Sequence, residues 1–349
     1  MGLSIHANEA GRRDVTAAPS FDVACLGNAI VDIICKTGSE TISRFHLAKG
    51  SMKLISALRE IELVTRELKP CVMVAGGTAA NVATGVVSLG GRSAFFGQVA
   101  ADEAGRIFCH DLKGAGVHVP VMPASAQVNP TSRSLIIVTP DGHRTMMTYL
   151  GCSVEIPATI LDAGIIGRSK FLVIEAYLFD HPTSRETALA AANMARRMNR
   201  RTVLLLCDGA TVQRHRAEIL SFVRNSVDVL IANESELASL YQTDRLQDAV
   251  LTLARNVSLG AITRGERGSL VIARGEVVSI PAERVGKVVD KTGSGDIYAA
   301  GFLLGLARGM TIEKAGRLGS LAGAEIVCQI GARPEANLEN LARLRGFIW

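Results

Sequence analysis

The turn between residues 290 and 296 carries the clearest chemistry in the sequence. It reads Asp-Lys-Thr-Gly-Ser-Gly-Asp and leads directly into an apolar helix predicted over 297–307. Small residues let the backbone approach a phosphate, whose charge is met by unpaired N–H groups and the positive end of the helix dipole. An acid in the first helical turn is placed to accept a proton from an attacking hydroxyl. The candidates are Gly293, Ser294 and Gly295 for the anion hole and Asp296 for the catalytic base; a tight turn with Asp296 as a helix cap is the alternative.

Asn28 and Asp32 form a second polar group, just after a strand predicted over Phe21–Leu26. In a parallel sheet the ligand binds beyond the carboxyl ends of the strands, so both side chains are expected at the site. The Asp32 carboxylate can accept two hydrogen bonds from vicinal hydroxyls, which suits a ribose diol. An ordinary turn with an Asx-type bond is the alternative interpretation.

These motifs resemble those of the ribokinase-like (PfkB) carbohydrate kinase family. The family's C-terminal signature is an Asp, a Thr and then Gly-Ala-Gly-Asp entering a helix; here Ser294 replaces the Ala, and Lys291 stands where a small or β-branched residue is commoner. The run at 76–81 is similar to the family's glycine pair at the head of a helix, although a plain strand-to-helix turn is the alternative there. The resemblance implies that the substrate-binding residues are Asn28, Asp32, Gly76, Gly77 and Asn81.

Two further motifs, in the order that the family has them, concern the nucleotide, and the resemblance implies ATP and Mg²⁺ as cofactors. Asn233 and Glu236 match N-x-x-E, which organises magnesium and its waters, and Mg²⁺ prefers oxygen ligands and keeps several waters. A solvated acidic helix start is the alternative. Thr263, Gly265 and Gly268 match T-x-G-x-x-G, a loop that borders the nucleotide, although two glycines before a strand are also typical of a turn.

The acceptor is predicted from a narrower resemblance. The segments 27–32, 139–146 and 331–333 are most similar to the adenosine-kinase-like branch, so adenosine or another purine nucleoside is the first expectation and a free sugar such as ribose or fructose the alternative. By analogy with that branch, Arg144 binds the transferring phosphate on closure, a role that suits a guanidinium; a solvated arginine is the alternative. The candidates for lining a base pocket are Phe45, Leu47 and Tyr149.

Two rival functions are less consistent with the motifs. A regulator that keeps the fold without catalysis would have lost the base, Asp296, or the turn at 290–296, which we call the anion turn. Both are present. A kinase of phosphorylated sugars would need extra Lys or Arg near the substrate loops, and 27–32 and 76–81 contain none. A kinase that phosphorylates a hydroxyl group of a nucleoside or of a free sugar is therefore favoured over both.

The elements that must position these residues alternate between strands and helices. Buried strands are predicted at 21–26, 171–174, 203–206, 229–232 and 259–263, with helices such as 185–198 and 215–224 between them. This alternation predicts a parallel sheet covered on both faces, and an antiparallel edge is expected at 269–273 and 276–280. The fold class expected is α/β, a ribokinase-like three-layer α/β/α domain with a central mostly parallel sheet and a small β-sheet lid.

A predicted β-hairpin at 132–139 and 144–149, joined by Pro-Asp-Gly-His, breaks the alternation. With the segment after Asp32 it is expected to form the lid, so the lid segments, approximately 33–55 and 125–150, are inserted in a domain that spans 21–349. Residues 1–20 are expected to be a loose tail. A homodimer is compatible with the sequence, because the lid sheet can cover the site alone or pair with that of a second subunit.

Composition narrows the class of partner. The net charge of +5 comes from 38 basic and 33 acidic residues that are spread along the chain, so neither nucleic acid nor a membrane is an expected partner. No apolar stretch near the start resembles a secretory signal, and the run at 297–307 is too short to span a bilayer. The seven cysteines are scattered without a CxxC pair, which predicts reduced thiols, no zinc site and no disulfide framework. A soluble cytoplasmic protein is expected.

Overall fold

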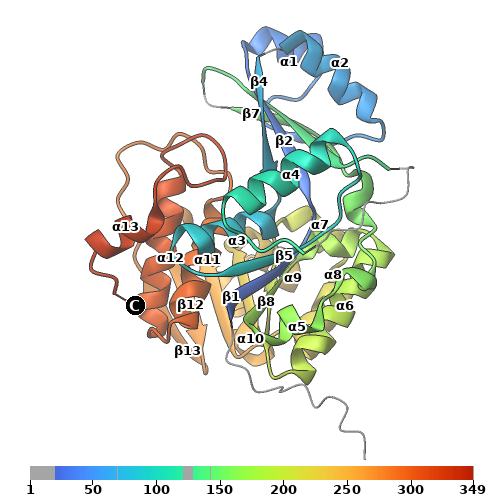
Figure 1. Cartoon of the computed structure of the whole chain (residues 1–349). Coiled ribbons are helices and arrows are strands. Elements are labelled where there is room, and N and C mark those ends of the chain that lie inside the picture. The colour runs from blue at the N-terminus through green and yellow to red at the C-terminus, as the bar shows by residue number, and fades with distance from the viewer. Residues whose placement is uncertain (1–19, 69, 121–128, 142, 349) are drawn as a thin grey trace, which may run out of the picture.

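The computed structural model describes residues 20–68, 70–120, 129–141 and 143–348. Over these residues the chain forms a large β-sheet in the body of the molecule and a smaller sheet that stands above it in Figure 1. The tail predicted over 1–20 falls almost wholly on residues 1–19, which lie outside the described residues, as do residues 125–128 of the predicted lid. No described helix has the length and hydropathy needed to cross a membrane.

The large sheet has eight strands. The two neighbouring pairs of strands at one edge are antiparallel, and the other neighbouring pairs are parallel. In chain order they are β1 (Phe21–Leu26), β5 (Ser93–Phe96), β8 (Ser169–Glu175), β9 (Arg201–Leu205), β10 (Val229–Asn233), β11 (Leu259–Thr263), β12 (Ser269–Ala273) and β13 (Glu276–Ile280). Their order across the sheet is β13-β12-β11-β10-β9-β8-β1-β5. The predicted mostly parallel sheet with an antiparallel edge is confirmed.

Helices cover both faces of this sheet, because successive residues of each buried strand point to opposite sides. In β1, Val23 and Cys25 join one core and Ala24 and Leu26 the other. The first layer contains α3 (Thr78–Ser88), α4 (Glu103–Gly114), α11 (Ser294–Ala307), α12 (Ile312–Ile326) and α13 (Leu338–Leu344). The second contains α5 (Ala163–Gly167), α6 (Pro182–Arg197), α7 (Gly209–Arg214), α8 (Arg216–Ser226), α9 (Glu234–Tyr241) and α10 (Leu246–Asn256). Short 3₁₀ turns lie at Gly151–Val154, Ala158–Ile160, Ala176–Asp180 and Gly265–Arg267. The three-layer α/β/α architecture is thus confirmed.

Helix α11 is apolar on every side because neighbours surround it. It packs between α3 and α12, and a Cβ atom on Gly301 would lie 2.7 Å from the carbonyl oxygen of Leu318 in α12. A helix buried all round needs no polar face. This packing fixes the start of α11, and with it the anion turn, relative to the head of α3.

The smaller sheet, which we call the lid sheet, has five strands. Across the sheet they are β3 (Met52–Leu54), β7 (Arg144–Tyr149), β6 (Ser132–Val138), β2 (Ile30–Lys36) and β4 (Cys71–Gly76). Two helices, α1 (Ser39–Arg44) and α2 (Leu58–Leu68), cover the face of the lid sheet that points away from the body (Figure 1). Between these helices and the sheet, Ile33, Leu135 and Met147 pack with Ile61 and Val64.

The structure adds to two sequence predictions about the lid. Phe45, Leu47 and Tyr149 pack against the core between the lid sheet and the helices α1 and α2, and their expected place in a base pocket stays a prediction. Strand β4 was not among the predicted lid segments, yet it pairs with β2 from Ile30 to Cys35 and forms an edge of the sheet. Its apolar stretch leads into a helix, which by itself does not tell to which sheet the strand belongs.

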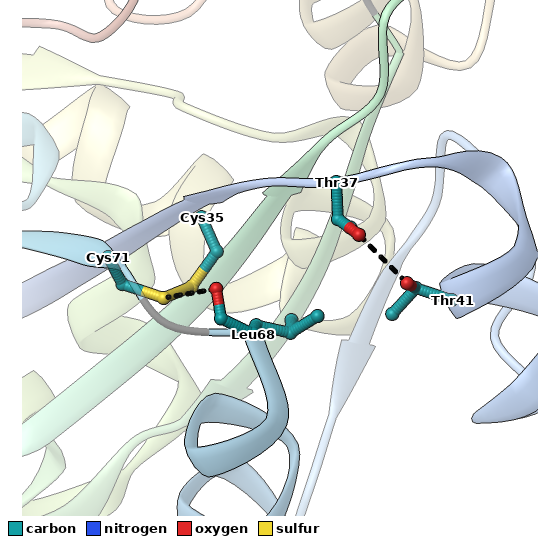
Figure 2. The surroundings of a disulfide bond; sticks show 5 residues. All are labelled: Cys35, Thr37, Thr41, Leu68 and Cys71. Atoms are coloured by element: carbon teal, nitrogen blue, oxygen red, sulfur yellow. Dashed lines mark hydrogen bonds between the residues drawn. A yellow bond between two sulfur atoms is a disulfide. The ribbon is translucent and has the colours of Figure 1, made fainter.

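A disulfide joins Cys35 and Cys71, which are partners in the β2–β4 ladder (Figure 2). Their Cα atoms are 4.5 Å apart. The prediction of reduced thiols without a disulfide is therefore wrong for this pair. The two residues lie 36 positions apart in the sequence, and only the antiparallel register places them opposite each other.

We expect loss of this disulfide to lower the free energy of unfolding by about 3–4 kcal/mol, because the cross-link restricts the unfolded chain over a loop of this length. The double variant Cys35→Ser/Cys71→Ser, compared with wild type in urea unfolding without reductant, measures the effect. Cys328→Ser, which removes an exposed free thiol, is the matched control. Seven reactive thiols in unfolded wild-type protein that was never reduced, instead of five, would contradict the assignment.

Candidate functional site

The polar residues predicted from separate motifs come together where β1, β2 and β4 meet the heads of α3 and α11. The side-chain amide of Asn81 donates a hydrogen bond to Oδ2 of Asp296 at 2.8 Å. The carboxylate of Asp32 reaches Gly76, since a Cβ atom there would lie 2.4 Å from Oδ2. Residues more than 200 positions apart therefore share one site at the carboxyl edge of the sheet.

Gly77 shows why a glycine is needed at the head of α3. Its φ of 96° is a conformation that residues with a side chain rarely adopt, and a Cβ atom would lie 2.4 Å from the carbonyl oxygen of Asn28. The backbones of the two substrate loops thus touch directly. This contact holds Asn28 next to the loop that carries Asn81.

Glu175, at the end of β8, is a site residue whose role the sequence did not reveal. It is fully buried, and its two carboxylate oxygens accept hydrogen bonds from the backbone N–H of Asn28 at 2.8 Å and of Ala79 at 2.9 Å. Burial raises its pKa to about 7, although both hydrogen bonds act in the opposite direction. An acid at the end of an apolar strand is the signal that the sequence offers. Glu175 positions the loops at Asn28 and at Ala79.

Three buried amide oxygens at this edge have no hydrogen-bond partner among the described residues. They are Oδ1 of Asn28, Oδ1 of Asn81 and Oε1 of Gln98, and each side chain is at most 6% exposed. Buried polar atoms are nearly always paired, so these oxygens indicate a ligand that donates hydrogen bonds. Hydroxyl groups of a polyol are such donors. Gln98 lies directly after β5 and the glycine at 97. It is a second site residue that the sequence alone did not indicate.

The two acids of the site have raised pKa values. Burial raises the pKa of Asp296 to about 6, against the effects of the Asn81 hydrogen bond and of Arg333. Burial also raises the pKa of Asp32 to about 6; Arg144 and Arg333 oppose that shift, and the nearby charge of Asp296 adds to it. A carboxylate with a pKa just below neutrality is ionised at pH 7 and still basic enough to take a proton.

The anion turn enters α11 with the expected geometry. Gly293 is the N-cap at a φ of 75°, and a Cβ atom on it would lie 2.3 Å from Cβ of Ala332. The first intrahelical hydrogen bond runs from the N–H of Ile297 to the carbonyl oxygen of Gly293 at 2.9 Å. The N–H groups of Gly295 and Asp296 precede that bond and are available to an anion.

A cavity of about 520 Å³ lies beside the anion turn. Its lining includes Asp296, Thr263, Gly265, Asn233, Glu236 and the three turn residues Gly293, Ser294 and Gly295. Gly268 lies outside this lining. Its φ of 77° and the closeness of the Ile280 carbonyl oxygen, 2.0 Å from where its Cβ atom would be, give it a role in the turn into β12.

Asn233 and Glu236 form a capping box at the start of α9. The N–H of Glu236 donates to Oδ1 of Asn233, and Oε2 of Glu236 accepts from the N–H of Asn233, both at 2.9 Å. Burial raises the pKa of Glu236 to about 7. No cluster of three His, Cys, Asp or Glu side chains that could hold a metal exists among the described residues. The Oε1 atom of Glu236 also accepts from the side-chain amide of Asn233 at 2.6 Å, so each carboxylate oxygen already has one donor, which suits the waters of a magnesium ion better than direct coordination.

Arg144, at the start of β7, forms an ion pair with Asp290, and both side chains are buried. Asp290 also accepts hydrogen bonds from the N–H of Thr292 at 3.0 Å and of Gly331 at 2.9 Å. The lid sheet is therefore tied to the anion turn through Arg144. Its expected contact with a transferring phosphate stays a prediction.

Arg333 is a second cation at the site, and the sequence reading gave it no role of its own. Burial lowers its pKa to about 10, and the carboxylates of Asp32, Asp111 and Asp296 act against that shift. The guanidinium is therefore charged at neutral pH. Its position beside Asp32 and Asp296 follows only from the fold, because Arg333 lies in a loop after α12.

Comparison with known proteins agrees with this geometry. The pfkB family carbohydrate kinase model matches residues 47–338. A 5-dehydro-2-deoxygluconokinase of Geobacillus kaustophilus (strain HTA426) is 25% identical over 312 residues, which cover 86% of this chain and 92% of that protein.

Solved structures give higher identities. A probable sugar kinase from Rhizobium etli CFN 42 is 40% identical with a TM-score of 0.87, and covers 94% of this chain and 99% of its own. An adenosine kinase from Sinorhizobium meliloti is 41% identical with a TM-score of 0.86, over 93% of this chain and 99% of its own. With its ribokinase-like fold and its matched motifs, the chain belongs to the pfkB family of carbohydrate kinases, which are phosphotransferases acting on sugar or nucleoside hydroxyls.

Proposed function

We propose that this kinase transfers the γ-phosphoryl group of ATP to the primary hydroxyl of a nucleoside, with adenosine as the first candidate, and forms the 5′-monophosphate. The observation that carries the proposal is the chemical gradient along the face of the lid sheet opposite α1 and α2, which we call the open face. The similarity to an adenosine kinase at 41% identity supports the same acceptor.

The open face is built of rungs of paired residues across the strands. The rung after Ile30 and Ser132 is polar and contains Asp32, Ser134 and Thr148, the last two hydrogen-bonded at 2.9 Å. The next rung is apolar: Ile34, Ile136 and Met146. A ribose diol at Asp32 would therefore extend its base toward an apolar surface, which suits a purine.

The outermost rung, Lys36, Val138 and Arg144, lines a separate cavity of about 700 Å³ with the loop at 287–290. Neither Asp32 nor a residue of the apolar rung lines this cavity.

A free sugar is the second candidate acceptor. The names of the Geobacillus and Rhizobium proteins, a 5-dehydro-2-deoxygluconokinase and a probable sugar kinase, favour it. Both classes of acceptor would use Asp32, Asn28 and Asn81 for their hydroxyls. They differ in whether the apolar rung is occupied.

The residues of the site divide the reaction between them. Asp296 takes the proton of the acceptor hydroxyl, whose oxygen attacks the γ-phosphorus, and the N–H groups of the anion turn stabilise the charge of the moving phosphoryl group. Asn81 orients the base through its hydrogen bond to Oδ2. Asn28, Asp32, Gly76 and Gly77 hold the acceptor so that its hydroxyl lies in line.

We also propose that Asn233 and Glu236 hold the water shell of a magnesium ion bound to the phosphates in the cavity beside the anion turn. When bound, the ion neutralises phosphate charge. Thr263 and Gly265 border the nucleotide, with Gly268 behind them. A cytoplasmic location, supported by the need for ATP, and a homodimer through the lid sheets stay predictions.

The acceptor can be tested directly. We expect ADP release with ATP and Mg²⁺ to respond to adenosine and, more weakly, to other purine nucleosides, because only a nucleoside occupies both the polar and the apolar rung. A coupled assay against adenosine, guanosine, inosine, cytidine, ribose and fructose measures this. Turnover of ribose or fructose without any nucleoside would replace the nucleoside by a sugar, and silence across the panel would contradict both.

Asp296→Asn should lower kcat by about 10²–10⁴-fold, because the base is lost while the amide oxygen still accepts from Asn81. Acceptor binding, measured by calorimetry, should change little. Asp248→Asn, an exposed change in the first turn of α10, is the matched control.

The same assignment determines the acid side of the pH profile. Because burial raises the pKa of Asp296 to about 6, wild-type kcat should be full above that pH and fall below it as the base is protonated. A fall only near pH 4, or near-normal turnover of Asp296→Asn, would rule out Asp296 as the base.

Glu236→Gln should raise the Mg²⁺ concentration needed for half-maximal activity by about 10-fold or more, the usual effect of losing a residue that supports a metal from the outer shell. The amide oxygen of glutamine can still accept from the N–H of Asn233, whereas its NH2 group cannot accept from the Asn233 side-chain amide, so the capping box should be retained and Tm should fall slightly. Glu218→Gln in the first turn of α8 is the control. An unchanged Mg²⁺ requirement would leave Glu236 as a helix cap only.

A further inference from the structure

Arg333 follows a stretch of backbone that lies between the anion turn and the open face of the lid sheet. The preceding residue, Ala332, packs directly against Gly293 of the anion turn. Gly331, one residue earlier, lies beside the lid sheet, since Cδ1 of Ile34 is 3.9 Å from where a Cβ atom on this glycine would be. The backbone at 331–333 is thus held on both sides, and the N–H of Gly331 is bound to Asp290.

The guanidinium of Arg333 is buried without full pairing. Its Nε and Nη2 atoms are inaccessible to solvent and have no hydrogen-bond partner among the described residues. Three carboxylates, those of Asp32, Asp111 and Asp296, surround it closely enough to act on its charge. Arg144, the other cation of the site, has its charge met by an ion pair with Asp290.

Buried donors that lack acceptors lower the stability of the folded protein, and a charged donor lowers it most. An arginine cannot avoid this by giving up its proton at neutral pH. The unpaired N–H groups therefore point to a ligand that brings oxygen acceptors. Such a ligand would lie near the carboxylates that act on Arg333, among them Asp32 and Asp296, which hold the acceptor under the proposed function.

We propose that Arg333 contacts the acceptor oxygen that becomes phosphorylated and the phosphoryl group that arrives on it. The inference rests on the proposed function in one respect, namely that an acceptor hydroxyl lies at Asp296. In the reaction the hydroxyl proton passes to the Asp296 carboxylate, a bond forms between the acceptor oxygen and the γ-phosphorus, and the bond from that phosphorus to the bridging oxygen of ATP breaks, releasing ADP. The N–H groups of Arg333 then donate to the non-bridging oxygens.

This contact grows stronger as the reaction proceeds. With the free acceptor, Arg333 meets a neutral hydroxyl, whereas with the transferring group and the product it meets a charged phosphate oxygen. An interaction made mainly in the transition state acts on kcat, and one made mainly with the product acts on product affinity. The KM for the acceptor should therefore change least.

Three variants separate this role from a structural one. Arg333→Met removes the charge and all donors with little loss of volume, and Arg333→Lys keeps the charge with a different donor geometry. Arg200→Met is the matched control, because Arg200 also has a buried Nε without a partner among the described residues. Arg200 directly precedes β9 and so lies at the amino end of that strand, whereas the site lies at the carboxyl ends. For each variant we would measure kcat, KM for the acceptor, Tm, and the Ki of the phosphorylated product competing with the acceptor.

The probes are adenosine with AMP, or, where the wild type uses a sugar, ribose with ribose 5-phosphate or fructose with its monophosphate. For Arg333→Met we expect kcat to fall by about 10²-fold, the usual effect of losing one donor to a developing negative charge. The product Ki should rise at least about 10-fold while KM for the acceptor changes less than about 3-fold. Arg333→Lys should recover part of kcat. Tm should be unchanged or higher, because an unpaired buried charge is removed.

A fall in Tm together with equal weakening of acceptor and product would make Arg333 a structural residue and overturn the inference. An Arg333→Met enzyme with unchanged kcat and product Ki would do the same. Failure of the proposed function is seen in a different place, in the wild-type enzyme, as turnover of a sugar and not of adenosine. The ratio of variant to wild type on that sugar then still decides the role of Arg333.

Discussion

The arrangement of the site depends on the ion pair and the hydrogen bonds that the Asp290 carboxylate forms. It pairs with Arg144 of the lid sheet and accepts hydrogen bonds from the backbone of Thr292 in the anion turn and of Gly331 after α12. Three segments far apart in the sequence are thus held by one buried acid. Removing one partner of a buried pair leaves an uncompensated charge, so such a junction favours one arrangement of its members.

A second buried acid performs the matching task on the acceptor side. Glu175 binds the backbone at Asn28 and at Ala79, and so fixes the two loops whose side chains face the acceptor. Because its oxygens accept from backbone N–H groups, its effect does not depend on any neighbouring side chain. Asp296, the proposed base, is positioned twice, by the packing of α11 against its neighbours and by Asn81.

The family scaffold separates the chemistry from the choice of acceptor. The anion turn, Asp296 and the cavity beside them belong to the body. The polar and apolar rungs belong to the lid sheet, which also packs on its own two helices. Under the proposed function, changes at the apolar rung, away from Arg144 and its pair with Asp290, would alter the acceptor without disturbing the start of α11.

The sequence by itself determined the local elements and their chemistry. The alternation of apolar strands with helices predicted the mostly parallel sheet, and the turn from Asp290 to Asp296 predicted an anion site entering a helix, because both depend on short-range periodicity and backbone rules. The tertiary structure decided what depends on register and distance. It alone brought Cys35 opposite Cys71, placed Tyr149 on the covered face of the lid sheet, and set Glu175 beneath two loops. It also brought Ala332, next to Arg333, against Gly293 of the anion turn, since a long-range contact leaves no periodic signal in the chain.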